Sequence, residues 1–402
     1  MIGNSEIYKK AISEITLKVR ESLRKNDDID LEIHIEEELF KSKYINDIYA
    51  GDITGLITEI KYRIESKYGI LYPLLSDETI NEIMVNGPEN IFIEKNGRME
   101  LTSLSFLSER ELEDMIRLFA SDVHREINEV NPIVDARLES GYRVNGVLKN
   151  VALNGPILTI RKFNKNTIKM DDLIRFNTLD YECAQFLSII VKARYNIMIS
   201  GSTSSGKTTF LNALTGYVDK ENERIIVIED SAELKIDTIK NVVHMECRNS
   251  NSVGKGEVSM SKLIKTSLRM RPDRIIVGEV RGEEIKDMIQ AMSTGHSGSM
   301  STGHAGSSEG MLYRLEAMYL MSADIPLISI KKQISDSLEV LIHLERDKYG
   351  KRKVAEISEL VGLNDDSYTL NKLYVLNDNG MLIKTGNKLI RNRKLKRMEI
   401  NE

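Results

Sequence analysis

Residues 201–209 have the spacing of a phosphate-binding loop. The run reads Gly201, Ser202, Thr203, Ser204, Ser205, Gly206, Lys207, Thr208 and Thr209. An apolar run at 196–200 precedes it and a helix-forming run at 210–214 follows it, so the loop is expected to join a strand to a helix. Backbone N–H groups of such a loop face the β-phosphate, Lys207 reaches the β- and γ-phosphates, and the Thr208 hydroxyl can bind Mg²⁺. The motif therefore predicts a site for ATP and Mg²⁺.

Two further apolar runs end in carboxylates. Residues 225–228 precede Glu229 and Asp230, and residues 275–278 precede Glu279. In an open parallel sheet, ligands bind beyond the carboxyl ends of the strands, so these side chains are expected to converge on the Mg²⁺–phosphate region. One carboxylate would hold the water shell of the metal and another would orient the attacking water. Acidic residues also end strands in solvent without any role, and the P-loop upstream favours the catalytic interpretation.

A segment rich in glycine and serine, residues 295–306, contains His296 and His304. Zinc binding is not favoured, because no cysteine or further histidine follows at ligand spacing. A polar histidine near a γ-phosphate fits the segment better, and a merely structural histidine is the alternative.

Three arginines precede the P-loop at positions 137, 143 and 161. The charge that develops on a transferring phosphoryl group favours an arginine supplied from another domain or subunit. For any one of Arg137, Arg143 and Arg161, a surface ion pair is the competing interpretation.

The pattern of apolar residues divides the chain into five parts. Residues 1–70 show helical spacing and predict a helical extension, and residues 71–163 mix short strands with a helix at 109–120, as in an α+β domain. Residues 164–172 are a polar linker. Residues 173–383 alternate strands and helices, which predicts an α/β domain with a largely parallel sheet covered on both faces. Residues 384–402 form a basic tail, expected to be solvated, with contact to an anionic membrane or a partner as the alternative.

Composition narrows the class of protein. The 402 residues are 41% hydrophobic and 29% charged, with a formal net charge of -5, which disfavours a protein that coats nucleic acid. Two cysteines, Cys183 and Cys247, do not make a disulfide framework. The sequence shows neither a signal-peptide pattern nor an apolar run of about 18 residues. We expect a cytoplasmic protein whose membrane contact is peripheral or through a partner.

Together these motifs resemble the type II/IV secretion ATPases, and within them the CpaF-type motors of tight-adherence (Tad) pili. The resemblance covers most of residues 75–362. The stretches that carry it, besides the P-loop, are Ile83–Gly87, Ile91–Glu94, Pro132–Asn145, Leu158–Phe163, Ile228–Leu234, Gly254–Val258, Leu268–Gly282 and Ala291–Ala305.

The resemblance implies a cytoplasmic homohexamer that binds ATP between an α+β N-terminal domain and a C-terminal RecA-like domain. It would drive pilus assembly or retraction, or protein secretion, through an inner-membrane platform protein, without direct contact to nucleic acid. In such a motor Glu279 polarises the water, Glu229 and Asp230 belong to the aspartate box, and His304 ends the histidine box. The resemblance also implies that the three arginines reach the phosphates and that Arg281 acts beside Glu279.

Ser202 and Ser204 stand where the family usually has glycine. If either position needs a positive φ, a serine there costs roughly 1 kcal/mol.

Two other functions remain open at this point. A DNA-translocating ATPase of conjugation, or a helicase, would share the P-loop but is disfavoured by the acidic balance of the chain. A nucleotide-gated scaffold without hydrolysis is disfavoured by the intact Glu229 and Glu279.

Overall fold

The computed structural model describes residues 6–24, 30–95, 98–162, 167–248, 256–347, 349–377 and 379–398. The chain forms two compact units, Met1–Lys165 and Asn166–Glu402, called here the N-terminal unit and the P-loop unit. Residues 163–166 lie outside the described residues, so the first part of the predicted linker, 164–166, is not described, nor is the last residue of the stretch 158–163. The glycine at 254 also lies outside the described residues. Among the described residues, no helix combines the length and apolar character needed to cross a membrane.

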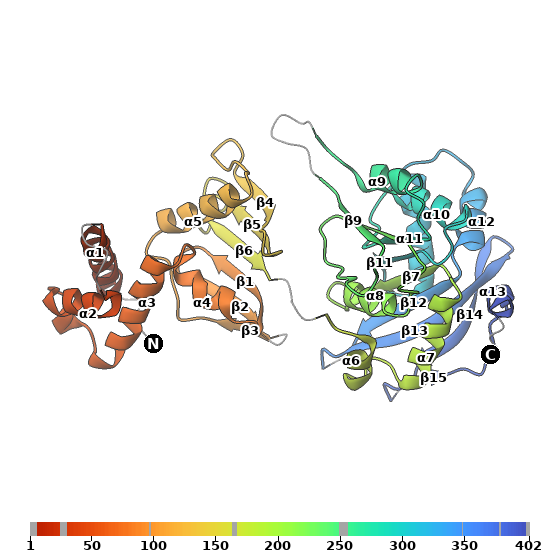
Figure 1. The fold of residues 1–402 in the computed structure, drawn as a ribbon, viewed down its shortest axis with the longest axis horizontal. Coiled ribbons are helices and arrows are strands. Elements are labelled where there is room, and N and C mark those ends of the chain that lie inside the picture. The colour runs from red at the N-terminus through yellow and green to blue at the C-terminus, as the bar shows by residue number, and fades with distance from the viewer. Residues whose placement is uncertain are drawn as a thin grey trace. The chain divides into compact units, whose positions relative to one another are not determined.

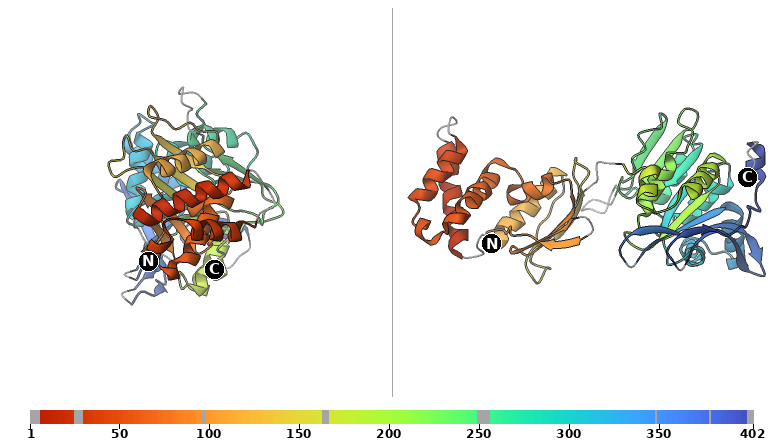
Figure 2. Two further views of the ribbon diagram at one scale, coloured as in Figure 1. Left: turned by 90° about the vertical axis from the view of Figure 1, so that its left-hand side faces the viewer. Right: turned by 90° about the horizontal axis from the view of Figure 1, so that it is seen from below.

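The N-terminal unit begins with the predicted helical extension. Its helices are α1 (Glu6–Leu23), α2 (Leu31–Lys41) and α3 (Ile53–Glu65), with short 3-10 turns at Ile45–Asp47, Ala50–Asp52 and Gly69–Leu71. Apolar residues at helical spacing, among them Ile15, Leu39 and Ile60, form a core of their own between the three helices. Arg63, only 4% exposed, pairs with Glu59 and with Glu111 of the α+β domain. These ion pairs tie the extension to that domain, beside which its helices lie in Figures 1 and 2.

The rest of the N-terminal unit is an antiparallel sheet with a helix on one face. The strand order is β3-β2-β1-β6-β5-β4, and α5 (Glu109–Asp122) packs on the sheet through Ile116 and Phe119. The strands are β1 (Ile80–Asn86), β2 (Asn90–Lys95), β3 (Arg98–Leu101), β4 (Ile133–Arg137), β5 (Arg143–Val147) and β6 (Ile157–Arg161), and α4 (Tyr72–Ser76) precedes them. Alternate residues such as Val144 and Ile160 face the core, so their neighbours in sequence lie on the other face of the sheet.

The P-loop unit is built on a nine-stranded sheet of order β15-β14-β13-β12-β7-β11-β10-β8-β9. From β12 to β9 neighbouring strands are parallel, and β13, β14 and β15 extend the sheet in antiparallel fashion. The parallel strands are β7 (Ile197–Gly201), β8 (Ile225–Glu229), β9 (Val242–Glu246), β10 (Arg274–Val277), β11 (Met300–His304) and β12 (Val340–Arg346). The antiparallel ones are β13 (Arg352–Asn364), β14 (Ser367–Leu376) and β15 (Leu382–Lys384).

Helices cover both faces of this sheet, as the continuous apolar strands predicted (Figure 1). One face packs against α6 (Met170–Arg175), α7 (Tyr181–Lys192) and α8 (Lys207–Thr215). The other packs against α9 (Met260–Ser267), α10 (Ile285–Ser293), α11 (Ser308–Leu320) and α12 (Leu327–Ser337). Every residue of β7, β8 and β10 is buried, which explains why these strands lack an alternating pattern.

The basic C-terminal segment is solvated only in part. Lys388, Arg393, Lys396 and Arg397 are exposed as expected, whereas two apolar residues and two of the cations pack against the unit. Leu389, which precedes α13 (Arg393–Arg397), and Leu395, which lies on it, are buried in the core of the P-loop unit. The Arg391 guanidinium donates to the carbonyl oxygens of Leu338 and Leu360, and Lys394 donates to that of Arg194. The expectation did not include this packing, which arises because the apolar residues between the charges are buried in the core of the unit.

Candidate active site

The phosphate-binding loop starts where β7 ends at Gly201 and finishes where α8 begins at Lys207. Gly206 caps the helix with φ +95°, and Ser204 has φ +59°. Ser204 is therefore the serine that occupies a left-handed position, at a cost of about 1–2 kcal/mol. The Ser205 hydroxyl oxygen is buried and has no hydrogen-bond partner among the described residues. A helix N-terminus with a buried, unpaired hydroxyl suits an anionic ligand.

Lys207 lies inside the loop, and its side chain is held there by polar contacts. Its Nζ atom donates to the carbonyl oxygens of Gly201 at 3.2 Å and Ser202 at 3.0 Å, and it lies 3.3 Å from His304 Nδ1. Burial lowers the pKa of Lys207, and the nearby Glu279 carboxylate opposes that shift. The ammonium group is thus placed where the phosphates of a nucleotide would lie.

The strand register brings the predicted carboxylates to the same edge of the sheet. His304 at the end of β11 lies opposite Gly201 of β7, and its Nε2 atom is 2.9 Å from Glu279 Oε1. The Arg281 guanidinium is 2.8 Å from Glu279 Oε2 and 3.3 Å from Asp230 Oδ2. Polar contacts therefore link the P-loop lysine, through His304, Glu279 and Arg281, to the aspartate that follows β8.

Glu279 Oε1 differs from the other atoms of this chain. It is buried, and no described donor reaches it with regular hydrogen-bond geometry, although His304 is close. Burial lowers the pKa of His304 below its ordinary value, against the pull of Glu279, so the neutral imidazole is favoured at pH 7. A buried carboxylate oxygen beside a neutral histidine has the capacity to accept a proton from water.

Glu229 has a different environment from the one expected. It is 3% exposed, and its Oε1 atom accepts hydrogen bonds from the backbone N–H groups of Glu233 at 2.8 Å and Leu234 at 3.0 Å. The side chain therefore closes the loop that follows β8. Gly278 lets it come so close, because a Cβ atom there would lie 2.9 Å from Glu229 Cγ. The sequence analysis missed this use of Gly278, since it depends on two strands meeting.

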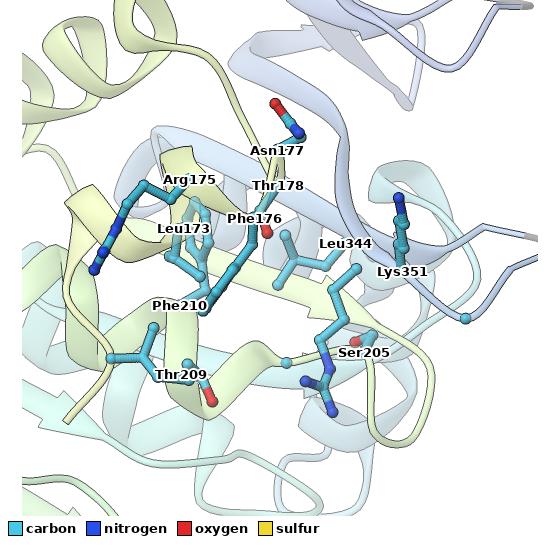
Figure 3. A pocket seen from close by; sticks show the side chains of 14 residues that line it. Leu173, Arg175, Phe176, Asn177, Thr178, Ser205, Thr209, Phe210, Leu344 and Lys351 are labelled. Carbon is cyan, nitrogen blue, oxygen red and sulfur yellow. The ribbon is translucent and has the colours of Figure 1, made fainter. Parts of the chain in front are cut away.

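A cavity of about 410 Å³ opens beside the P-loop (Figure 3). In Figure 3 the side chains of Leu173, Phe176 and Phe210 gather on one side, and Ser205 and Lys351 lie across from them. The lining is apolar around Leu173, Phe176 and Phe210, and its cations are Arg175 of α6 and the Lys351 and Arg352 side chains of the β12–β13 hairpin. Its apolar walls suit a flat ring, and its place beside the loop suits a base attached to phosphates. No local motif marks Phe176, so sequence reasoning missed it.

Comparison with known proteins assigns the family. The model of the type II/IV secretion system protein family matches residues 65–372, more than half of the chain. A putative conjugal transfer protein of Mycobacterium tuberculosis is 33% identical over 298 residues, which cover 73% of this chain and 84% of that protein. This chain belongs to the type II/IV secretion system protein family.

Two further comparisons show how far the family likeness extends. An uncharacterised protein of Methanocaldococcus jannaschii is 42% identical over 247 residues, which cover 59% of this chain but 34% of that protein. The chain thus spans about a third of that relative. The crystal structure of the pilus retraction motor PilT with bound ADP has the same fold, with a TM-score of 0.52, 18% identity and coverage of 82% of this chain and 85% of that one. The P-loop unit accordingly has the RecA-like fold that was predicted for it.

The three arginines of this secretion-family chain form a single row in the N-terminal unit. Arg137 of β4 lies opposite Arg143 of β5, and Arg143 lies opposite Arg161 of β6. The row continues to Glu82 of β1. The core face holds Val144 and Ile160, so the arginines lie on the face away from α5. Sequence spacing did not show this alignment, which comes from the antiparallel register.

Proposed function

We propose that this chain is an ATPase that powers a pilus or secretion machine. The observation that carries the proposal is the linked set of Lys207, His304 and Glu279 at the carboxyl ends of β7, β11 and β10. The set ends in a buried carboxylate oxygen, Glu279 Oε1. Lys207 would bind the β- and γ-phosphates, and the backbone N–H groups of residues 202–208 would surround the β-phosphate.

The residues of the loop fit a magnesium ion bound through the nucleotide. No group of three or more His, Cys, Asp or Glu side chains could hold a metal alone in the part of the chain that the structure describes. Mg²⁺ commonly needs only one or two protein ligands beside phosphate oxygens, and Thr208 and Glu229 are the residues proposed to supply them. Once bound, the ion would neutralise charge on the phosphates.

Hydrolysis would proceed by attack of water on the γ-phosphorus. The oxygen of water forms the new P–O bond, the bond from the γ-phosphorus to the β–γ bridging oxygen breaks, and ADP leaves. Glu279 Oε1 takes the proton of the water, while Arg281 holds the other carboxylate oxygen and His304 sets the position of the first. The arginine row of the N-terminal unit, Arg137, Arg143 and Arg161, would supply charge to the phosphates from a second domain or subunit.

The larger setting of the motor is inferred from the family. We propose a homohexamer of the CpaF type that acts at the cytoplasmic face of the inner membrane on a platform protein. Closure of the two domains on ATP and their release after hydrolysis would drive that platform. Size determination with and without an ATP analogue tests the hexamer, and a pull-down with the platform protein tests the partner.

Phosphate release tests the site itself. Lys207→Ala should lose nucleotide binding, and Glu279→Gln should keep binding but lose turnover by roughly 100-fold or more. Glu283→Gln, an exposed carboxylate four residues further along the chain, is the matched control and should behave as wild type. Near-normal turnover by Glu279→Gln would refute its role as the base. Tight ATP binding by wild type without phosphate release would identify a nucleotide-gated scaffold instead.

A DNA-translocating motor is the second candidate, because one relative carries the name of a putative conjugal transfer protein. It predicts turnover stimulated by DNA and binding that weakens steeply with salt. A filter-binding assay across a salt titration separates the two, and the net charge of -5 leads us to expect no binding at physiological salt.

A further inference from the structure

The hairpin between β12 and β13 reaches past the end of the P-loop strand. Leu344 of β12 lies opposite Gly201, the last residue of β7, and β12 continues for two more residues to Arg346. The chain then turns back and re-enters the sheet with Arg352, which is paired with Arg346. This register brings Arg352 to the phosphate-binding loop, although 148 positions separate it from Ser204.

Arg352 touches the loop at two neighbouring points. Its Nε–H donates to the carbonyl oxygen of Ser204 at 3.2 Å. Its aliphatic part packs over Gly206, where an added Cβ would lie 2.9 Å from Arg352 Cδ. The same side chain lines the cavity beside the loop, together with Ser205, Gly206 and Thr209. Arg352 therefore lies where the loop and the cavity meet.

The contact falls on the one loop residue whose backbone is strained. Ser204 has φ +59°, a region that a residue with a Cβ atom rarely adopts. A charged donor on its carbonyl oxygen stabilises the peptide in this orientation. Among the described residues of the loop, Ser204 is the only non-glycine with a positive φ. The Arg352 hydrogen bond therefore acts at the strained position of the loop.

We propose that Arg352 is a positioning residue for the nucleotide. It holds the Ser204 peptide in the conformation that the phosphate loop needs, and it brings a cation to the mouth of the cavity, on the side of the phosphates. The inference rests on the proposed ATP site. It adds Arg352 to the proposed site. Arg352 belongs neither to the P-loop, nor to the strand ends that carry Glu279 and His304, nor to the arginine row.

The hairpin provides a matched control. Arg346 has the same side chain, is also exposed, and is paired with Arg352 across the hairpin, but it does not line the cavity. For Arg352→Ala we expect the dissociation constant of a fluorescent ATP analogue and the KM for ATP to rise about 10-fold. The kcat value should change less than about 2-fold, because the lost interaction is present before and during the reaction. Arg346→Ala should match wild type in all three quantities. Equal affinity of Arg352→Ala and Arg346→Ala would overturn the proposal.

The Ser204→Gly background tests the route of the effect. Glycine adopts a positive φ without strain, so the conformation of the loop should then depend less on the hydrogen bond from Arg352. We expect the loss of affinity caused by Arg352→Ala to shrink from about 10-fold to about 3-fold or less in that background. An equal loss in both backgrounds would show that Arg352 acts by charge alone and would overturn its role through Ser204.

The two proposals can fail separately. If wild type binds ATP and Glu279→Gln abolishes turnover while Arg352→Ala changes nothing, only the role of Arg352 fails. If wild type neither binds nor hydrolyses ATP, the proposed function fails and the role of Arg352 with it.

Discussion

In the P-loop unit the candidate site joins groups of opposite charge and one neutral histidine, whereas in the N-terminal unit three arginines stand side by side. Lys207, His304, Glu279, Arg281 and Asp230 follow one another with separations of 2.8–3.3 Å. Arg137, Arg143 and Arg161 instead occupy facing positions on β4, β5 and β6. Like charges directly opposite one another repel across a sheet, while neighbouring charges of opposite sign attract. The two regions therefore differ in how their charges are ordered, by pairing of opposite charges in one and by repetition of one charge in the other.

The largest expected effect comes from breaking the arginine row at its centre. We expect Arg143→Ala to lower ATP turnover about 100-fold, because an arginine aimed at the transferring phosphoryl group contributes at least that much. The free energy of unfolding should change by about 1 kcal/mol or less, since the Arg143 side chain lies outside the core of the unit. Phosphate release and urea unfolding measure the two quantities.

Arg98→Ala on β3, at the edge of the same sheet, is the control and should leave turnover unchanged. Full activity of Arg143→Ala would mean that the row is only a surface feature.

The next effect probes the structural carboxylate of the P-loop unit. Glu229→Ala removes the acceptor of two backbone N–H groups and opens space beside Gly278. We expect a loss of about 2–4 kcal/mol in the free energy of unfolding, measured in urea. Asp230→Ala, whose side chain is about half exposed, should cost less than about 0.5 kcal/mol. Similar stabilities of the two variants would contradict the role of Glu229 in closing its loop.

The smallest expected effect is a pH dependence carried by His304. Burial lowers the pKa of His304 below its ordinary value of 6.5, so below that pH the unfolded chain binds a proton more readily than the folded one. The contribution of His304 to stability is therefore complete above about pH 6.5 and is lost as the pH falls. We expect His304→Gln to lose less stability than wild type between pH 7.5 and 5.5 in urea titrations.

Two other histidines, His244 and His343, also have a pKa lowered by burial, and their contribution is common to both proteins. Parallel pH profiles of wild type and His304→Gln would show that His304 does not titrate in this window.

Contiguous motifs were the part of the site that the sequence predicted well. The P-loop spacing placed Lys207 between a strand and a helix, and the apolar runs before Asp230 and Glu279 placed both carboxylates at one edge of a parallel sheet. These inferences succeed because a loop between a strand and a helix, and a residue at a strand end, are defined by their immediate neighbours. The expectation of a solvated basic tail was only partly right, because Leu389 and Leu395 pack against residues that are far away in the sequence.

By itself, the sequence determined the alternation of strands and helices, the phosphate loop and the family to which the chain belongs. Only the tertiary structure decided that three arginines form one row, that Glu229 closes its own loop, and that Arg352 meets Ser204. The main physical reason is strand register, because pairing sets which residues face each other across a sheet. It aligns the three arginines, places Glu229 against Gly278, which follows the neighbouring strand, and brings Arg352 to the phosphate loop.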